Sequence, residues 1–194
     1  MQYIIAGLGN PEPKYKDTRH NIGFHVLDEL ENILNTEIRK SKFNSLFAEA
    51  IYKERKLFLV KPQTYMNLSG IAIAQIKNFY KINVSNLIVV HDELDLSLGT
   101  LRIKFGGGTA GHNGLNSIIN SIGDNKFIRI RVGIGRPPEN IQGSDYVLSK
   151  FSKKEKSIVD EVVTKACDAV LEIVSSDVKT AMNKFNNNNK QELK

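Results

Sequence analysis

The segment NLIVVHDE, residues 86–93, constrains the fold more than any other part of the sequence. Its continuous run Leu-Ile-Val-Val lies between polar ends, which is typical of a strand buried on both faces of a sheet. Residues 2–6 form a second short apolar run, which ends at Gly7. Because strands of this kind need helices to cover both faces, the two segments favour an α/β fold.

Amphipathic helical patterns alternate with apolar strand patterns along the rest of the chain. Helices are expected at about 20–34, 67–80, 113–122, 152–174 and 177–185. Strands are expected at 46–53 and 56–61, as a hairpin, and at 100–105 and 127–135. Asp17 or Thr18 is expected to cap the first helix. The alternation predicts a single α/β domain over residues 1–185, with a twisted mixed, mostly parallel sheet flanked by helices, and a flexible polar tail over 186–194.

Composition narrows the class of protein without identifying it. The sequence has 27 Lys and Arg against 21 Asp and Glu, and the net charge of +6 is compatible with a polyanionic partner. No run of about 20 apolar residues is present, and the N-terminus lacks the features of a signal peptide. We therefore expect no membrane association and a cytoplasmic location. The only cysteine, Cys167, lies in a helical apolar pattern, which favours a small core residue over a nucleophile.

Two glycine motifs resemble nucleotide-binding loops but lack the residues that contact phosphate. Gly7-x-Gly9 is followed by Asn10 and Pro11 instead of the helix start that a dinucleotide fingerprint requires. Residues 106–111 have the spacing of a phosphate loop, but the Lys-Ser/Thr pair is missing after them. The sequence therefore predicts no nucleotide cofactor.

The segment HDELD contains residue types that bind metals, but their spacing is unfavourable. In a strand, His91 and Glu93 point to one face and Asp92 to the other, so the three side chains cannot converge on one ion. No H-x-x-x-H pair or cluster of Cys and His occurs elsewhere in the sequence. We therefore expect no metal site.

His20 and Asp92 are the strongest candidates for catalysis. His20 lies where a polar loop meets a helix, and an imidazole exchanges protons near neutral pH. Asp92 follows a buried strand, and open α/β sheets place their sites at this end of the strands. The carboxylate could orient His20, and without a G-x-S-x-G motif the nucleophile would be water. The structural alternatives are a histidine that caps a helix and an aspartate that caps a loop.

Three asparagines lie beside expected element starts, namely Asn10, Asn67 and Asn113. Each could simply be a cap or turn residue. The glycine run before Asn113 favours a ligand-binding role, because glycine lets the backbone approach a ligand closely. An amide can pair with a peptide backbone or stabilise an oxyanion.

Two pairs of basic residues lie on strands near the expected site. Arg102 and Lys104 share one face of the strand at 100–105, and Arg129 and Arg131 share one face of the strand at 127–135. These rows could contact phosphates at the mouth of a cleft, or they could be solvated strand faces.

Four segments together resemble the bacterial peptidyl-tRNA hydrolase family over residues 1–185: GLGNPEPKYKDTRHNIGF (7–24), KPQTYMNLSG (61–70), HDELDLSLG (91–99) and GGGTAGHNGLNS (106–117). Enzymes of this family cleave the ester that joins a peptide, or an N-blocked amino acid, to the 3′ end of tRNA. The resemblance implies a monomeric α/β hydrolase that needs no cofactor or metal and releases tRNA for reuse in translation. One departure is Ala110, where the family usually has glycine.

The resemblance also assigns roles to individual residues. It implies that His20 is the catalytic base, that Asp92 orients it, and that Asn10 recognises the blocked amino group. It implies substrate or tRNA contacts for a second set: Tyr15, Tyr65, Met66, Asn67, Lys104, His112, Asn113 and Arg131. In that set, Lys104 and Arg131 are expected to hold the 5′ phosphate region of the tRNA. Asn67 and Asn113 are expected to line the substrate channel, and His112 to neighbour the site. Tyr15, Tyr65 and Met66 are expected near the tRNA end or the peptide.

Two other functions remain open at this point. The first is a non-catalytic RNA-binding relative of the same family that acts in RNA processing, and the second is a metal-dependent peptidase on a related scaffold. The joint presence of His20, Asp92, Asn67 and Asn113 favours the hydrolase, and the lack of a ligand cluster disfavours the peptidase.

Overall fold

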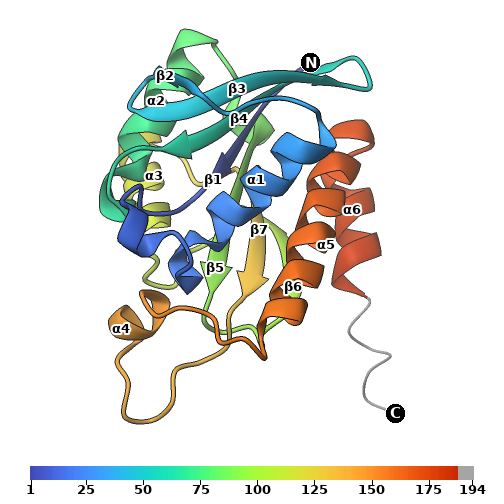
Figure 1. The fold of residues 1–194 in the computed structure, drawn as a ribbon. Coiled ribbons are helices and arrows are strands. Elements are labelled where there is room, and N and C mark those ends of the chain that lie inside the picture. Colours follow the sequence, from blue (N-terminus) through green and yellow to red (C-terminus); the bar gives the residue numbers. More distant parts are fainter. Residues whose placement is uncertain (188–194) are drawn as a thin grey trace.

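Seven strands form one mixed sheet in the computed structural model, which describes residues 1–187 (Figure 1). Their spatial order is β2 (Lys40–Lys42), β3 (Ser45–Tyr52), β4 (Arg55–Pro62), β1 (Gln2–Gly7), β5 (Leu87–Glu93), β7 (Ile128–Gly133) and β6 (Leu101–Phe105). The four central strands β4, β1, β5 and β7 are parallel, whereas β2, β3 and β6 pair antiparallel at the two edges. The predicted mixed sheet with a parallel centre is confirmed.

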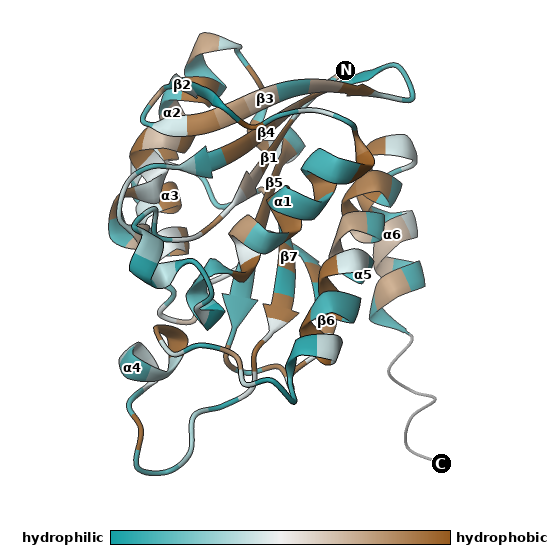
Figure 2. Cartoon of the chain, in the orientation of Figure 1, coloured by the Kyte–Doolittle hydropathy of each residue, from teal (hydrophilic) through white to brown (hydrophobic). Residues whose placement is uncertain are grey.

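Helices cover both faces of the sheet. One face is covered by α1 (Ile22–Ile33), α5 (Lys156–Ser175) and α6 (Val178–Asn186), and the other by α2 (Ser69–Phe79) and α3 (Asn113–Ile122). A short helix, α4 (Gly143–Val147), lies near the carboxyl ends of the central strands (Figure 1). Figure 2 shows that the middle of the sheet is apolar and that the carboxyl end of β5 is hydrophilic. Polar residues therefore replace the apolar core at the carboxyl end of β5.

A close contact between α1 and the central strands positions the polar loop after β1. Gly23, in the first turn of α1, packs against the backbone of Leu8 and Val90. A Cβ atom at this position would lie 2.4 Å from Leu8 N and 2.5 Å from Val90 O, so only glycine fits without a shift. The start of α1 is therefore held against the ends of β1 and β5.

The helix that was expected from about residue 20 begins with a 3₁₀ turn, Arg19–Asn21, and continues as α1. The predicted cap is wrong: neither Asp17 nor Thr18 caps α1 with its side chain. Thr18 Oγ1 instead donates to the carbonyl of Tyr15 at 2.8 Å and closes the preceding turn. Local sequence suggested a cap here, but the 3₁₀ turn moves the helix start past both residues.

The exposed edge of β6 is closed by the last residue of α6. Asn186 Oδ1 accepts from Ile103 N at 2.8 Å, and Asn186 Nδ2 donates to Ile103 O at 2.9 Å. The side-chain amide therefore pairs with the edge strand as another strand would. Of the tail expected at 186–194, residues 188–194 lie outside the described part of the chain.

None of the helices within residues 1–187 is both long enough and apolar enough to cross a membrane.

Candidate active site

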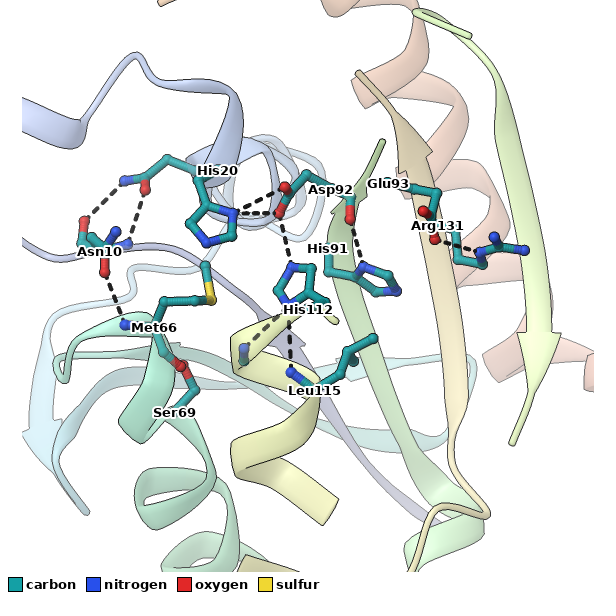
Figure 3. Close-up of polar contacts among 12 residues, drawn as sticks. Asn10, His20, Met66, Ser69, His91, Asp92, Glu93, His112, Leu115 and Arg131 are labelled. Atoms are coloured by element: carbon teal, nitrogen blue, oxygen red, sulfur yellow. Dashed lines mark hydrogen bonds and ion pairs between the residues drawn. The ribbon is translucent and has the colours of Figure 1, made fainter. Parts of the chain in front are cut away.

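The predicted contact between His20 and Asp92 is present at the carboxyl end of β5. His20 Nδ1 lies 2.8 Å from Asp92 Oδ1 and 2.9 Å from Asp92 Oδ2, and both residues are buried (Figure 3). Because a carboxylate only accepts, Nδ1 carries a proton, and in the neutral imidazole Nε2 then keeps its lone pair. His20 Nε2 has no hydrogen-bond partner within residues 1–187 and is therefore available to take a proton.

His112 is the second imidazole bound to the same carboxylate. Its Nε2 lies 3.0 Å from Asp92 Oδ1, and its ring centroid lies 5.1 Å from that of His20. Burial alone raises the pKa of the Asp92 carboxyl. The attraction of His20 and His112 and the hydrogen bonds that they donate outweigh burial, and they hold this pKa well below its usual range. Asp92 is therefore ionised at any ordinary pH.

A cleft of about 320 Å³ opens beside these three residues. Its lining comes from four parts of the chain: the turn before α1, the carboxyl end of β5, the glycine loop before α3, and α4. His20, Asp92, His112 and Asn113 all line it, and Asn113 is exposed at the start of α3. Four of the residues predicted for the site thus meet in one cleft.

Asn10 lies in a neighbouring hydrogen-bonded cluster. Its Oδ1 accepts from the backbone N–H of Met66 at 2.9 Å, and its backbone pairs with the side-chain amide of Asn21 through two bonds of 2.9 Å. Asn10 Oδ1 is therefore occupied, and its Nδ2 has no partner within residues 1–187. Figure 3 shows the Met66 thioether directed toward His20, so this cluster adjoins the catalytic pair. Asn10 Nδ2 can therefore donate to a substrate.

The remaining candidates for acceptor-end contacts lie around this cluster. Tyr65 is exposed and its hydroxyl donates to Glu12, while Tyr15 is half-buried beneath the ammonium of Lys14. Asn67 is exposed in the 3₁₀ turn before α2, and its side chain forms no hydrogen bond within the described residues. None of these three lines the cleft. Tyr65 and Asn67 are the sequence neighbours of Met66.

Lys104 and Arg131 lie on one face of the sheet but differ in their partners. Lys104 is exposed, and its side chain extends over Gly107 in the glycine loop. Arg131 Nε donates to Glu93 Oε2 at 2.9 Å. Arg129, expected from the pattern to accompany Arg131 in a basic row, is buried and donates to the carbonyl groups of Gly107 and Gly108. Arg129 thus stabilises the glycine loop through these two hydrogen bonds.

Comparisons with known proteins agree with this geometry. A family model described as peptidyl-tRNA hydrolase matches residues 4–193. A peptidyl-tRNA hydrolase from Clostridium botulinum (strain Alaska E43 / Type E3) is 47% identical over 184 residues, which cover 95% of each chain. One from Thermoanaerobacter sp. (strain X514) is 48% identical over 184 residues, which cover 95% of this chain and 99% of that protein.

A crystal structure of peptidyl-tRNA hydrolase from Acinetobacter baumannii superposes with a TM-score of 0.90 at 36% identity, covering 95% of this chain and 94% of that one. The chain belongs to the peptidyl-tRNA hydrolase family. The family match extends across the fold as well as the four motifs, so the motifs lie in the structural context that the resemblance implied.

His20, Asp92 and His112 are the kinds of residue that bind metals, and their ligand atoms all lie within 4.8 Å of one another. The spacing rule applied to HDELD could not detect this cluster, because its members come from three separate segments. Hydrogen bonding nevertheless disfavours an ion. His112 Nδ1 lies 3.1 Å from the backbone N–H of Gly114 and must accept from it, which leaves the proton on Nε2. A ring nitrogen that carries a proton cannot bind a metal.

Two residues that the sequence analysis did not single out, Asn21 and Arg19, support the site in this hydrolase. Asn21 pairs with the backbone of Asn10, as described above. Arg19 is buried, binds Glu155 at 3.0 Å and lies over the ring of Tyr146, so it holds the segment after α4 against the turn that carries His20. The only sequence feature that could have indicated this role of Arg19 is its position next to His20.

Ala110 also shapes the glycine loop that lines the cleft. Its φ of 49° lies in the left-handed region, which glycine adopts with less strain. The glycine that the family usually has at this position therefore has a physical reason. In this chain an alanine adopts this conformation.

Proposed function

We propose that His20 is the base, and Asp92 its orienting group, in the hydrolysis of the ester that joins a peptide to tRNA. As a member of the peptidyl-tRNA hydrolase family, this chain is an enzyme that acts on peptidyl-tRNA. The observation that carries the assignment of roles is the contact of His20 Nδ1 with both oxygens of a buried, ionised carboxylate. The opposite ring nitrogen is then left with its lone pair.

The reaction begins when His20 Nε2 takes a proton from a water molecule. The resulting hydroxide attacks the ester carbonyl carbon and forms a tetrahedral oxyanion. When this intermediate collapses, the bond to the 3′ oxygen of the tRNA breaks, and that oxygen receives the proton from His20. The imidazolium that exists between these steps lies against the Asp92 carboxylate, which stabilises it.

Side-chain amides near the catalytic pair supply donors for the oxyanion and for the peptide. Asn10 Oδ1 is held by Met66 N, and Asn10 Nδ2 has no partner within residues 1–187, so we assign Nδ2 to a carbonyl oxygen of the substrate. An N-blocked substrate carries such a carbonyl on its blocking group, whereas a free amino acid ester does not. This difference gives a physical basis for a preference for blocked substrates. Asn113 lines the cleft and Asn67 neighbours Met66 in the sequence, which supports assigning both to contacts with the peptide or the acceptor end.

The reaction as proposed needs no metal ion. We expect protein dialysed against EDTA, and then assayed with N-acetyl-aminoacyl-tRNA, to keep its full rate of hydrolysis. Magnesium is returned before the assay so that the tRNA stays folded, and zinc added afterwards should give no increase. The matched control substrate is the same aminoacyl-tRNA without its acetyl group, which should be cleaved much more slowly. Loss of activity that zinc restores would favour the metal-dependent peptidase instead.

The same assay separates the enzyme from a non-catalytic RNA-binding relative. The intact pair of His20 and Asp92 favours catalysis, because binding alone does not require an oriented base. Binding of the acetylated substrate without release of tRNA would contradict the proposed mechanism and favour the RNA-processing alternative.

We further propose that this enzyme binds the acceptor end and the 5′ phosphate region of tRNA as a cytoplasmic monomer. The catalytic pair, His112 and the cleft are all built from one copy of the chain. The net charge of +6 suits a polyanionic substrate. Peptidyl-tRNA forms where translation takes place, which supports the cytoplasmic location.

Lys104 is the stronger candidate of the two expected phosphate contacts. It forms no ion pair within residues 1–187, whereas Arg131 is paired with Glu93. We expect Lys104→Ala to raise KM, leave kcat nearly unchanged, and lower the slope of log K against log salt by about one. Arg131→Ala should act in the same direction with a smaller change, since its charge is already partly neutralised.

The measurement is kcat and KM at several salt concentrations. Lys179→Ala is the control, because Lys179 is an exposed lysine on α6, on the opposite side of the sheet from α3. A fall in kcat with KM unchanged would place Lys104 at the reacting centre and refute a role in holding phosphate.

A further inference from the structure

We propose that His112 is a positioning residue that α3 holds as the neutral Nε2–H tautomer, so that it pins the Asp92 carboxylate against His20. The inference rests on the proposed function, since it concerns how Asp92 orients the base. It replaces the expectation that His112 contacts the substrate. Figure 3 shows the hydrogen bonds of both ring nitrogens of His112.

The first nitrogen of His112 is fixed by the backbone of α3. His112 occupies the position just before this helix, and its Nδ1 lies 3.1 Å from Gly114 N and 3.4 Å from Leu115 N. A backbone N–H group can only donate, so Nδ1 accepts and carries no proton. The imidazole thus takes the place of the Ser, Asp or Asn side chain that usually caps a helix.

The bond at the first nitrogen determines that the second nitrogen, Nε2, carries the proton. A neutral imidazole without a proton on Nδ1 carries one on Nε2, and this group lies 3.0 Å from Asp92 Oδ1. Both ring nitrogens of His112 therefore have partners in the protein. Neither is left to bind a substrate, although an edge of the ring lines the cleft.

The consequence for Asp92 is a fixed orientation. Its Oδ1 receives hydrogen bonds from both His20 Nδ1 and His112 Nε2, while Oδ2 lies 2.9 Å from His20 Nδ1 alone. Because His112 also holds Oδ1, the carboxylate cannot rotate without breaking a charge-assisted hydrogen bond. The base is therefore oriented by a carboxylate that is itself oriented.

His91 supports this arrangement from within the core. Its Nδ1 donates to the carbonyl of Asp92 at 2.7 Å, and its ring packs edge-on against His112 with centroids 4.9 Å apart. Burial is the largest cause that lowers the pKa of His91, to about 3. The ring is neutral near pH 7, so it adds packing beside His112 without adding a competing positive charge.

Two variants separate the two bonds that His112 makes. His112→Asn places an oxygen near the position of Nδ1, so it keeps the helix cap but has no donor that reaches Asp92. His112→Gln extends an amide N–H toward the position of Nε2, so it keeps a donor for Asp92 but loses the cap. We expect His112→Asn to lower kcat about 10- to 100-fold, the usual worth of one hydrogen bond to a charged group, with KM nearly unchanged.

His112→Gln keeps a donor for Asp92, so we expect kcat to fall less than in His112→Asn, and the loss of the cap should lower the melting temperature. Asp177→Ala is the matched control for cap loss, because Asp177 caps α6 by accepting from Thr180 N at 2.9 Å. It should lower the melting temperature without a change in kcat. If His112→Asn instead raises KM with kcat unchanged, His112 is a substrate contact and the inference is wrong.

A double-variant cycle tests whether His112 acts through Asp92. In an Asp92→Ala background, His112→Asn should cause no further fall in kcat, because the group that it positions is already absent. A full additional fall would show an independent role and overturn the inference. ¹⁵N spectra of the unmodified protein at pH 7 should show His112 protonated at Nε2 and unprotonated at Nδ1, and a proton on Nδ1 would also overturn it. These outcomes are distinct from failure of the proposed function, which would appear as an active His20→Ala variant.

Discussion

Replacing His20 with alanine is expected to lower kcat by roughly 10²- to 10⁴-fold, the range that a positioned general base usually contributes. The variant keeps the cleft, the asparagines and the basic residues that bind the substrate, so KM should stay close to that of the unmodified enzyme. The fold should also persist, because His20 lies in a 3₁₀ turn at the edge of the core and its main partner is Asp92.

The measurement is single-turnover hydrolysis of N-acetyl-aminoacyl-tRNA, which isolates the chemical step from product release. His25→Ala is a matched control, since His25 lies in α1 and its ring bonds to the carbonyl of Lys16 instead of a site residue. The control should retain the normal rate. A His20→Ala variant with full activity would refute the assigned base and leave the family's reaction without the mechanism proposed here.

The parallel centre of the sheet could be predicted because its strands carry a strong pattern. Leu87, Ile88, Val89 and Val90 are fully buried, as a strand between two layers of helices must be. The edges carried no such signal. Strand β2 consists of three exposed residues, Lys40–Lys42, and it exists only because it pairs with β3. Helix α4 has five residues with no fully buried side chain, so its sequence shows no apolar periodicity.

The candidate site divides in a similar way. The contact between His20 and Asp92 could be foreseen, because loops after adjacent parallel strands meet at one end of the sheet. The contacts of His112 could not be foreseen. They depend on where the glycine loop places the start of α3, and several φ values in that loop lie in the left-handed region, including those of Gly107, Ala110 and Gly111.

The strand pattern predicted the correct face for Arg129 but not its burial. The strand pattern put Arg129 and Arg131 on the same face of β7, and the structure agrees. The pattern could not distinguish their environments. Arg129 is covered by the loop whose carbonyl groups it binds, whereas Arg131 is partly exposed beside Glu93. The alternating pattern indicates which face of a strand a side chain occupies. Whether that side chain is buried depends on segments that are distant in the sequence.

Replacing Asp92 with asparagine is expected to lower kcat by about 10³- to 10⁴-fold, because the wrong tautomer of an oriented histidine costs this much in comparable sites. In the unmodified protein, the two oxygens of the Asp92 carboxylate accept hydrogen bonds from His20 and His112. An asparagine has one oxygen and one NH₂ group in the same space. If its oxygen keeps the bond from His112, its NH₂ group faces the N–H of His20 Nδ1, and two donors oppose each other.

The imidazole of His20 relieves this clash by moving its proton to Nε2. That nitrogen is the one needed to deprotonate water, so the ring remains in place but cannot act as a base. The size of the side chain is unchanged, and we therefore expect a normal fold by circular dichroism and nearly normal substrate affinity. In ¹⁵N spectra, the proton of His20 should move from Nδ1 to Nε2 in the variant. Because His20 and Asp92 act as a unit, the double variant with His20→Ala should be no slower than His20→Ala alone. A kcat near that of the unmodified enzyme in Asp92→Asn would mean that the orientation of His20 does not limit the reaction.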